Sequence, residues 1–256
     1  MKVDRVLAPN PGPMTATGTN TWVVESGGEC VVIDPGPDLP GHLDAVQRAV
    51  RDSRTVVVAV THGHPDHAPG APVLAARLGV PTAGPASGGF RPDRVLADGD
   101  GIRFGTERLV AVATPGHTPD STCYRIGVSL FTGDHIMGGS TVMVEDMRLY
   151  LESLRRVQGI APSVIYPGHG PIVDDPTAVV AEYLAHRLER EAQILAAVRS
   201  GADTVGGVVG RVYAAVDPAL HPAAAVSVEA HLRKLAAEGL VRFSGGGWSG
   251  AVGALP

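Results

Sequence analysis

The chain has little cysteine, few aromatic residues and no long apolar run. Its two cysteines among 256 residues, Cys30 and Cys123, lie in apolar, strand-like segments. This excludes a disulfide framework, and we expect buried thiols in a reducing compartment. No run approaches the roughly 18 apolar residues of a membrane-spanning helix, and the N-terminal segment has no apolar signal-peptide core. We therefore expect a cytoplasmic protein with no membrane partner.

An excess of positive charge is also missing. The chain carries 21 basic and 26 acidic residues, a formal charge of −5, which excludes a protein that binds polyanions through its net charge. Hydrophobic residues are abundant, at 44%, and there are 33 glycines and 21 prolines. This composition supports a large core with many turns and favours a loop-rich α/β protein.

Strand patterns and helix patterns alternate along the first 200 residues. Short apolar runs bounded by turn residues predict strands, and longer amphipathic segments predict helices. The predicted strands span residues 21–25, 30–34, 55–60, 80–83, 94–97, 101–104, 107–113, 121–126, 129–132 and 163–166. The predicted helices span residues 42–51, 72–78, 145–157 and about 177–199. This order is typical of two mixed sheets covered by helices.

A change of composition at Ser200 and Gly201 predicts a domain boundary. We expect one domain over residues 1–200 and a smaller one over residues 201–256. In the smaller domain, two helices precede two short strands, an order that indicates a winged-helix-like fold. These elements are expected at residues 204–214, 223–238, 240–243 and 248–252.

The six residues 62–67, HGHPDH, carry the clearest chemical signal of the chain. They directly follow the apolar run 55–60. His62 and His64 are two residues apart, so they do not share a helix face, and Pro65 also disfavours a helix. The motif therefore sits on a loop at the carboxyl end of a strand. Imidazole and carboxylate groups at this density indicate metal ligands.

Three later segments repeat this arrangement of an apolar strand, a tight turn with glycine, and a ligand-type side chain. His117 follows LVAVA, Asp134 follows VSLFT, and His169 follows SVIYP. With the first motif, this makes seven potential ligands, which are His62, His64, Asp66, His67, His117, Asp134 and His169. Seven ligands exceed the need of one catalytic zinc ion. They suit two ions that share a bridging carboxylate.

The motifs HGHPDH, PGHT, TGDH and PGHG resemble the signature of the metallo-β-lactamase superfamily over roughly residues 9–175. The resemblance implies an αββα sandwich with the metal site at one edge between the sheets. It further implies a first metal held by His62, His64 and His117, a second held by Asp66, His67 and His169, and Asp134 as the bridge. Zinc is the expected metal, and manganese or iron are compatible with the same ligands.

Other segments resemble the lactamase-β-like protein 2 group within this superfamily. They include NPGPMTATGTNTW near the N-terminus and HRLEREAQIL at residues 186–195, followed by the winged-helix-like tail. Known members include a mitochondrial single-strand endoribonuclease and thioesterases that act on carrier-bound acyl chains. True class B β-lactamases do not use an aspartate bridge, so Asp134 argues against antibiotic hydrolysis.

The chemistry that the resemblance implies is hydrolysis by a hydroxide that bridges two metal ions. Asp66 would be both a ligand and the catalytic residue that orients the hydroxide. The G-x-S-x-G nucleophile elbow is absent from the sequence, which agrees with a reaction that uses no serine nucleophile. We expect a thioester or ester of a small or carrier-linked substrate. Cleavage of single-stranded RNA and a non-catalytic, metal-stabilised binding module are the alternatives.

The C-terminal domain has no net charge to support RNA binding. Between residues 201 and 256, four basic residues (Arg211, Arg233, Lys234 and Arg242) balance four acidic ones (Asp203, Asp217, Glu229 and Glu238). A nucleic-acid reader usually shows a basic footprint. We therefore expect this domain to pack over the metal site and shape the substrate cleft. The oligomeric state is not defined by the sequence.

Four further residues are candidates for supporting the ligands or contacting substrate. Asp34 ends a predicted strand and is expected to support a metal-bound histidine. Asn20 lies in the N-terminal loop, His135 follows the bridging aspartate, and Ser140 lies in a glycine-rich loop beyond it. For Asn20 a turn-capping role, and for His135 a structural role, are the competing interpretations.

Overall fold

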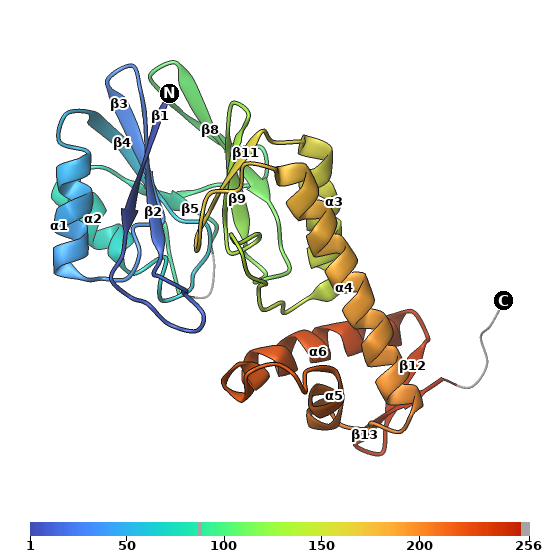
Figure 1. Ribbon diagram of the computed structural model, residues 1–256. Coiled ribbons are helices and arrows are strands. Elements are labelled where there is room, and N and C mark those ends of the chain that lie inside the picture. Colours follow the sequence, from blue (N-terminus) through green and yellow to red (C-terminus); the bar gives the residue numbers. More distant parts are fainter. Residues whose placement is uncertain (87–88, 252–256) are drawn as a thin grey trace.

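Two mixed β-sheets lie face to face, and helices cover both outer faces, in a computed structural model that describes residues 1–86 and 89–251 (Figure 1). This is the four-layer αββα arrangement that the resemblance implied. One end of the predicted strand 248–252, Val252, lies outside the described residues. A smaller C-terminal unit lies at one end of the sandwich.

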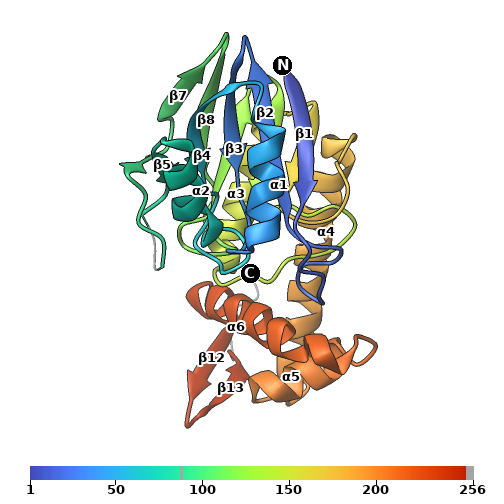
Figure 2. The same cartoon turned by 90° about the vertical axis from the view of Figure 1, so that its left-hand side faces the viewer.

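The first sheet has the strand order β1-β2-β3-β4-β5-β6, antiparallel from β1 to β3 and parallel from β3 to β6. Its strands are β1 Lys2–Leu7, β2 Asn20–Ser26, β3 Glu29–Ile33, β4 Arg54–Ala59, β5 Thr82–Gly84 and β6 Arg94–Val95. The helices α1 (Pro40–Ala49) and α2 (Gly70–Leu78) cover its outer face, as Figure 2 shows.

The second sheet has the order β11-β10-β9-β8-β7 and is antiparallel except for the parallel pair β10 and β11. Its strands are β7 Gly101–Phe104, β8 Glu107–Ala113, β9 Thr122–Ile126, β10 Ser129–Gly133 and β11 Val164–Pro167. Two helices, α3 (Met147–Ile160) and α4 (Pro176–Arg199), pack on its outer face. The side chain of Asp146 caps α3 by accepting a hydrogen bond of 2.9 Å from Leu149 N.

Alternate side chains of the central strands pack into two different hydrophobic cores, one between the sheets and one under the helices. On β2, Trp22 and Val24 point into the space between the sheets, whereas Val23 points toward α1 and α2. Val31 and Val32 on β3 divide in the same way. Strands that are apolar on both faces are typical of a sheet buried in a sandwich. The strand ends are thereby fixed, and the loops that leave them are held in place.

The C-terminal unit has the helix and hairpin order of a winged helix. It contains α5 Val205–Val212, a 3₁₀ turn Pro218–Leu220, α6 His221–Ala237, β12 Val241–Ser244 and β13 Gly247–Gly250. The last turns of α4 complete its core through Ile194, Ala197 and Val198, while the first turns of α4 pack against the second sheet through Val180 and Tyr183. Helix α4 therefore belongs to both cores, and the boundary at residue 200 stays a prediction.

The structure contains an edge strand that the sequence patterns did not reveal. β1 carries charged residues beside its valines, and its residues on the sheet edge are exposed or half-buried, so it lacks the apolar signal of a buried strand. Among the residues that the structure describes, no helix is both long and apolar enough to cross a membrane.

Candidate metal centre

The seven predicted ligands gather at one edge of the sandwich, each beyond the end of a strand. His62, His64, Asp66 and His67 follow β4, whereas His117 follows β8, Asp134 follows β10 and His169 follows β11. They form two groups, within each of which the ligand atoms lie within 4.8 Å of one another. The first group is His62, His64, His117 and Asp134, and the second is Asp66, His67 and His169.

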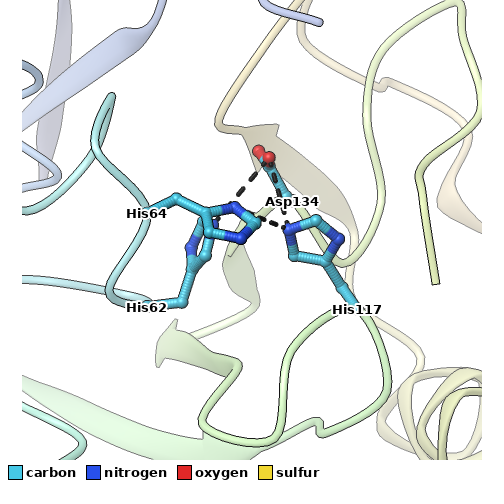
Figure 3. Close-up of side chains that lie close together, drawn as sticks. All are labelled: His62, His64, His117 and Asp134. Carbon is cyan, nitrogen blue, oxygen red and sulfur yellow. Dashed lines mark hydrogen bonds and ion pairs between the residues drawn. The ribbon is translucent and has the colours of Figure 1, made fainter. Parts of the chain in front are cut away.

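In the first group, the side chains point toward a common centre (Figure 3). His117 Nε2 lies 3.1 Å from His64 Nδ1 and 3.6 Å from Asp134 Oδ2. His62 Nε2 lies 3.9 Å from the same carboxylate oxygen. Metal–nitrogen bonds of about 2.0–2.1 Å in a tetrahedron place neighbouring ligand atoms about 3.3 Å apart, so these separations fit the edges of a coordination shell.

The second group has similar separations. His169 Nε2 lies 3.1 Å from Asp66 Oδ2 and 3.2 Å from His67 Nε2. His67 Nε2 lies 3.5 Å from Asp66 Oδ2. Asp134 faces this group as well, because its Oδ1 lies 3.3 Å from Nε2 of both His67 and His169. One carboxylate thus presents one oxygen to each group.

Groups behind the histidines determine which ring nitrogen faces the cluster. His117 Nδ1 lies 2.7 Å from Met143 O, and His169 Nδ1 lies 3.2 Å from Gly18 O. A carbonyl only accepts hydrogen bonds, so each Nδ1 carries a proton, and in the neutral ring Nε2 is the nitrogen that presents a lone pair to the cluster. His67 Nδ1 donates in the same way to Asp34 Oδ2, at 2.9 Å.

Thr61 fixes the ring of His62 so that its Nε2 also faces the cluster. The Thr61 hydroxyl donates to Asp34 Oδ2 at 2.7 Å, which leaves its oxygen to accept from His62 Nδ1 at 3.0 Å. His62 Nε2 is then free to face the cluster, where it is buried without a hydrogen-bond partner in the described structure, as is Asp134 Oδ1. Buried atoms of this kind are normally paired, and their arrangement fits divalent cations.

The electrostatics differ between the two groups. Burial, followed by the proximity of His67, holds the pKa of His62 well below its ordinary value. Burial lowers the pKa of His169 too, but Asp134 and Asp66 outweigh this effect and raise it to about 9. At neutral pH the His169 ring therefore carries a second proton in the metal-free chain, and a metal ion bound there would displace it.

Asp34 and Asn20 both contact the ligand loops. Asp34 accepts hydrogen bonds from Thr61 N and Thr61 Oγ1, both at 2.7 Å, besides that of His67. Its φ of 50° is unusual for a residue other than glycine. Asn20 donates through Nδ2 to Pro167 O and Gly170 O, both at 3.0 Å. It thereby clamps the turn that carries His169, which is a contact with the loop backbone and not with a ligand side chain.

His135 and Ser140 belong to neither of the two ligand groups. The ring of His135 is buried, packs edge-on against Tyr150 at 5.1 Å and has no hydrogen-bond partner among the described residues. Ser140 is exposed, and its carbonyl oxygen lies 2.5 Å from the Tyr183 hydroxyl. Their roles in support or substrate contact stay predictions.

Sequence reasoning missed Asp120, which holds the loop of the first motif. Its Oδ2 accepts a hydrogen bond of 2.9 Å from Gly63 N, between His62 and His64. Asp120 lies three residues after His117 in the turn PGHTPDS. An acidic residue in a turn next to a ligand was the available signal, but its partner is 57 residues away in the chain.

Two glycines beside the ligands are required by close packing. A Cβ at Gly133 would lie 2.3 Å from Thr61 Oγ1, and the residue has a φ of 50°. A Cβ at Gly168 would lie 2.7 Å from His67 Cε1 and 2.8 Å from Asp134 Oδ1. At Gly133 the positive φ agrees with the predicted tight turn, and at Gly168 the absence of a side chain leaves room for the cluster.

Comparisons with known proteins agree with this fold. Residues 14–169 match the family described as Metallo-beta-lactamase superfamily, and residues 204–248 match the Beta-lactamase associated winged helix domain. The chain is 31% identical to a Beta-lactamase-like protein 2 homolog of Caenorhabditis elegans, over 93% of this chain and 85% of that protein. It is 35% identical to an atrochrysone carboxyl ACP thioesterase of Aspergillus chevalieri, over 84% of this chain and 74% of that protein.

A solved structure shares the architecture across both domains. A metallo-beta-lactamase family protein from Thermus thermophilus superposes with a TM-score of 0.81 at 19% identity, over 97% of this chain and 98% of that chain. The agreement in fold extends through the C-terminal unit. The chain belongs to the metallo-beta-lactamase superfamily, in the group of the beta-lactamase-like protein 2 homologs, and is a hydrolase.

Proposed function

We propose that the chain hydrolyses carrier-linked acyl thioesters at a centre of two divalent metal ions, with zinc as the expected metal. His62, His64 and His117 would hold one ion, Asp66, His67 and His169 the other, and Asp134 both. Two bound ions would supply a nucleophilic water at neutral pH and stabilise the negative charge that develops on the carbonyl oxygen.

The position of Asp134 carries this proposal. Its two oxygens face different ligand groups, at 3.6 Å from His117 Nε2 and at 3.3 Å from His67 Nε2. Burial raises the pKa of Asp134, but His67 and His169 lower it by more, and the result lies well below the ordinary value. Asp134 is therefore ionised at neutral pH and able to neutralise part of the charge of two cations.

Asp66 is suited to act on the attacking water. Its side chain is 24% exposed, whereas those of His67 and His169 are buried, so Asp66 lies where solvent and substrate reach the cluster. Burial raises the pKa of Asp66, but hydrogen bonds from His169 and His67 lower it overall. The carboxylate thus stays ionised and can accept a hydrogen bond that orients a water molecule.

A covalent mechanism through cysteine has no support in this chain. Cys30 and Cys123 are both buried, and burial raises the pKa of both thiols, that of Cys123 to about 12. A nucleophilic cysteine must be a thiolate with access to substrate. The thioester bond would therefore be cleaved directly by water.

The substrate class is inferred from relatives and from charge. The name of the Aspergillus chevalieri relative assigns a carrier-linked thioester to that protein. Residues 201–256 carry no net positive charge, whereas a nucleic-acid-binding domain usually does, which disfavours RNA, the alternative substrate. Both considerations favour a thioester.

The test is a metal-reconstituted assay on two substrate classes. The purified chain, loaded separately with zinc, manganese or iron, is given a panel of acyl thioesters and a labelled single-stranded RNA. Asp134→Asn is assayed beside Asp174→Asn, an exposed control five residues after His169. We expect chelator-sensitive thioester cleavage that falls about 1,000-fold or more in Asp134→Asn and is unchanged in the control.

Cleavage of RNA with intact thioesters would replace the proposed substrate class and keep the metal centre. Thioester cleavage that persists in metal-free protein, or at the wild-type rate in Asp134→Asn, would overturn the proposed chemistry.

A further inference from the structure

Residues 137–146, the later part of the segment between β10 and α3, connect the turn of the predicted bridge Asp134 with the support of another ligand. Met143, in the middle of this segment, accepts the hydrogen bond of His117 Nδ1 through its carbonyl oxygen, at 2.7 Å. The same segment returns to the His117 loop at its end, where Glu145 N and Asp146 N donate to Gly116 O at 2.8 and 3.0 Å. The carbonyl of Met143 therefore sets both the tautomer and the direction of the His117 ring.

The residues on either side of Met143 are held by the C-terminal helices. Arg187 on α4 donates through Nη2 to Val142 O at 2.6 Å. Val144 N donates to Ser227 Oγ on α6 at 3.2 Å. Val142 and Val144 are themselves buried, in a core cluster that also contains Ala230 of α6. The peptide groups that flank Met143 are thus fixed by α4, which belongs to both cores, and by α6 of the winged-helix unit.

The hydrogen bonds to this segment explain why two polar side chains, those of Arg187 and Ser227, are buried. Arg187 is 2% exposed and Ser227 is 4% exposed. No ion pair to Arg187 occurs in the part of the chain that the structure describes, and its guanidinium lies 5.2 Å from the centre of the Tyr150 ring. Burial of a cation without a carboxylate is costly, so its hydrogen bond to the backbone of this segment is a substantial part of its compensation.

We propose that Ser227 and Arg187 are positioning residues for His117, so that the winged-helix unit forms part of the support of the first ligand group. The proposal rests on the two-metal centre proposed above. Loss of the Ser227 hydroxyl leaves Val144 N without its acceptor, and the Met143 carbonyl is then free to turn away from His117. The second group is supported separately, by Asp34 and Gly18, and is unaffected.

The experiment compares three variants in the full chain. Ser227→Ala removes the acceptor, and Ser227→Thr keeps a hydroxyl at the same place. Thr204→Ala removes the N-cap of α5, where Thr204 accepts from Gly207 N at 3.1 Å, so it weakens the same domain without touching residues 137–146. Such a cap loss lowers the melting temperature by roughly 2–4 °C.

Two quantities are measured for each variant. Zinc affinity is measured by competition with a chromogenic chelator. The solvent exchange of the His117 Nδ1 proton is measured by NMR on ¹⁵N-histidine-labelled protein, which does not depend on activity. We expect Ser227→Ala to lower the affinity for one of the two zinc ions about tenfold and to accelerate the solvent exchange of the His117 Nδ1 proton. Ser227→Thr and Thr204→Ala should bind both ions as the wild type does.

Wild-type zinc affinity and proton exchange in Ser227→Ala would overturn the proposal. An equal loss of affinity in Thr204→Ala would also overturn it, because general destabilisation would then be the cause. If the wild type binds two zinc ions but cleaves no thioester, the proposed substrate fails and the positioning role stands on its own data. If the wild type binds no zinc, both proposals fail.

Discussion

The two ligand groups differ in what lies behind their histidines. In the first group, the groups in direct contact with the histidines are neutral, a threonine hydroxyl for His62 and a backbone carbonyl for His117, and the Asp34 carboxylate reaches His62 only through Thr61. In the second group, the Asp34 carboxylate supports His67, and Asp66 adds a further negative charge among the ligands. A carboxylate behind a histidine increases its basicity as a ligand. We therefore expect the second group to bind its metal ion more tightly than the first.

Among substitutions that leave all seven candidate ligands in place, the largest effect is expected where both groups meet, at Gly168. In Gly168→Ala the new methyl group would overlap with His67 Cε1 and Asp134 Oδ1, at 2.7 and 2.8 Å. Because this displaces the shared carboxylate, we expect loss of metal from both groups and a decrease in kcat/KM of about 100-fold or more. Elemental analysis and the thioester assay measure the two effects.

Gly206→Ala is the matched control for this substitution. A Cβ at Gly206, on α5, meets no atom within 4 Å, and alanine is favoured over glycine in a helix by about 0.5–1 kcal/mol. This variant should keep its metals and unfold at a slightly higher temperature. A Gly168→Ala protein with wild-type metal content would contradict the shared position of Asp134.

The expected difference in metal affinity between the two groups should become smaller in Asp34→Asn. The carboxylate accepts from Thr61 N on Oδ1 and from Thr61 Oγ1 and His67 Nδ1 on Oδ2. The amide keeps only one of these two oxygens and loses the negative charge behind His67. We expect affinity for the more tightly bound metal to fall by about 10–100-fold. The control is Asp38→Asn, an exposed position four residues later. If chelator competition shows equal metal affinities for Asp34→Asn and the wild type, the negative charge of Asp34 does not explain tighter binding in the second group.

A smaller effect is expected from Asp120, which acts on the first motif through one backbone hydrogen bond. Asp120→Ala leaves Gly63 N without its acceptor, and we expect metal affinity in the first group to fall by up to about tenfold. Asp120→Asn keeps an oxygen acceptor and should lie within about threefold of wild type. If the two variants behave alike in chelator competition, the hydrogen bond has no part in holding His62 and His64.

The smallest effect concerns the contact that docks α6 on α4. Glu191 lies 2.7 Å from Lys234 Nζ and 3.1 Å from His231 Nδ1. Burial raises the pKa of Glu191, but His231 and Lys234 lower it below the ordinary value, and burial lowers that of His231. Because folding lowers the pKa of both Glu191 and His231, these residues stabilise the folded state at a pH above their unfolded pKa values. This stabilisation is lost as the pH falls through their folded pKa values.

Glu191→Gln should therefore destabilise the chain by about 1–2 kcal/mol at pH 7 and by less at pH 4. Thermal unfolding of variant and wild type across this range measures the difference. A gap in melting temperature that widens toward acidic pH would show that the sign of this linkage is wrong.

The clustering of the seven candidate ligands was predictable from the sequence because each lies shortly after the end of a strand. HGHPDH and the segments around His117, Asp134 and His169 each combine an apolar run, a glycine and a ligand-type side chain. Strand ends in a sandwich meet at common edges, so local patterns were enough to foresee which residues gather. The helices and most strands were predicted for the same reason, since their apolar periodicity is local.

The residues that support the candidate ligands were harder to predict from the sequence. The carbonyls of Met143 and Gly18 belong to residues whose side chains carry no chemical signal, and Asp120 acts on a residue 57 positions away. Asp34 was predicted from its place at a strand end, but its contact with Thr61 depends on the pairing of β3 with β4. These contacts arise from tertiary packing, which a single sequence does not specify.

The most direct test is a crystal structure of the zinc-loaded chain with anomalous scattering measured at the zinc edge, supported by elemental analysis of the same sample. We predict two zinc ions per chain, about 3.5–4 Å apart, with one oxygen of Asp134 on each and the two ligand groups divided between them. A single ion held by all the histidines, or two ions that do not share Asp134, would contradict the account.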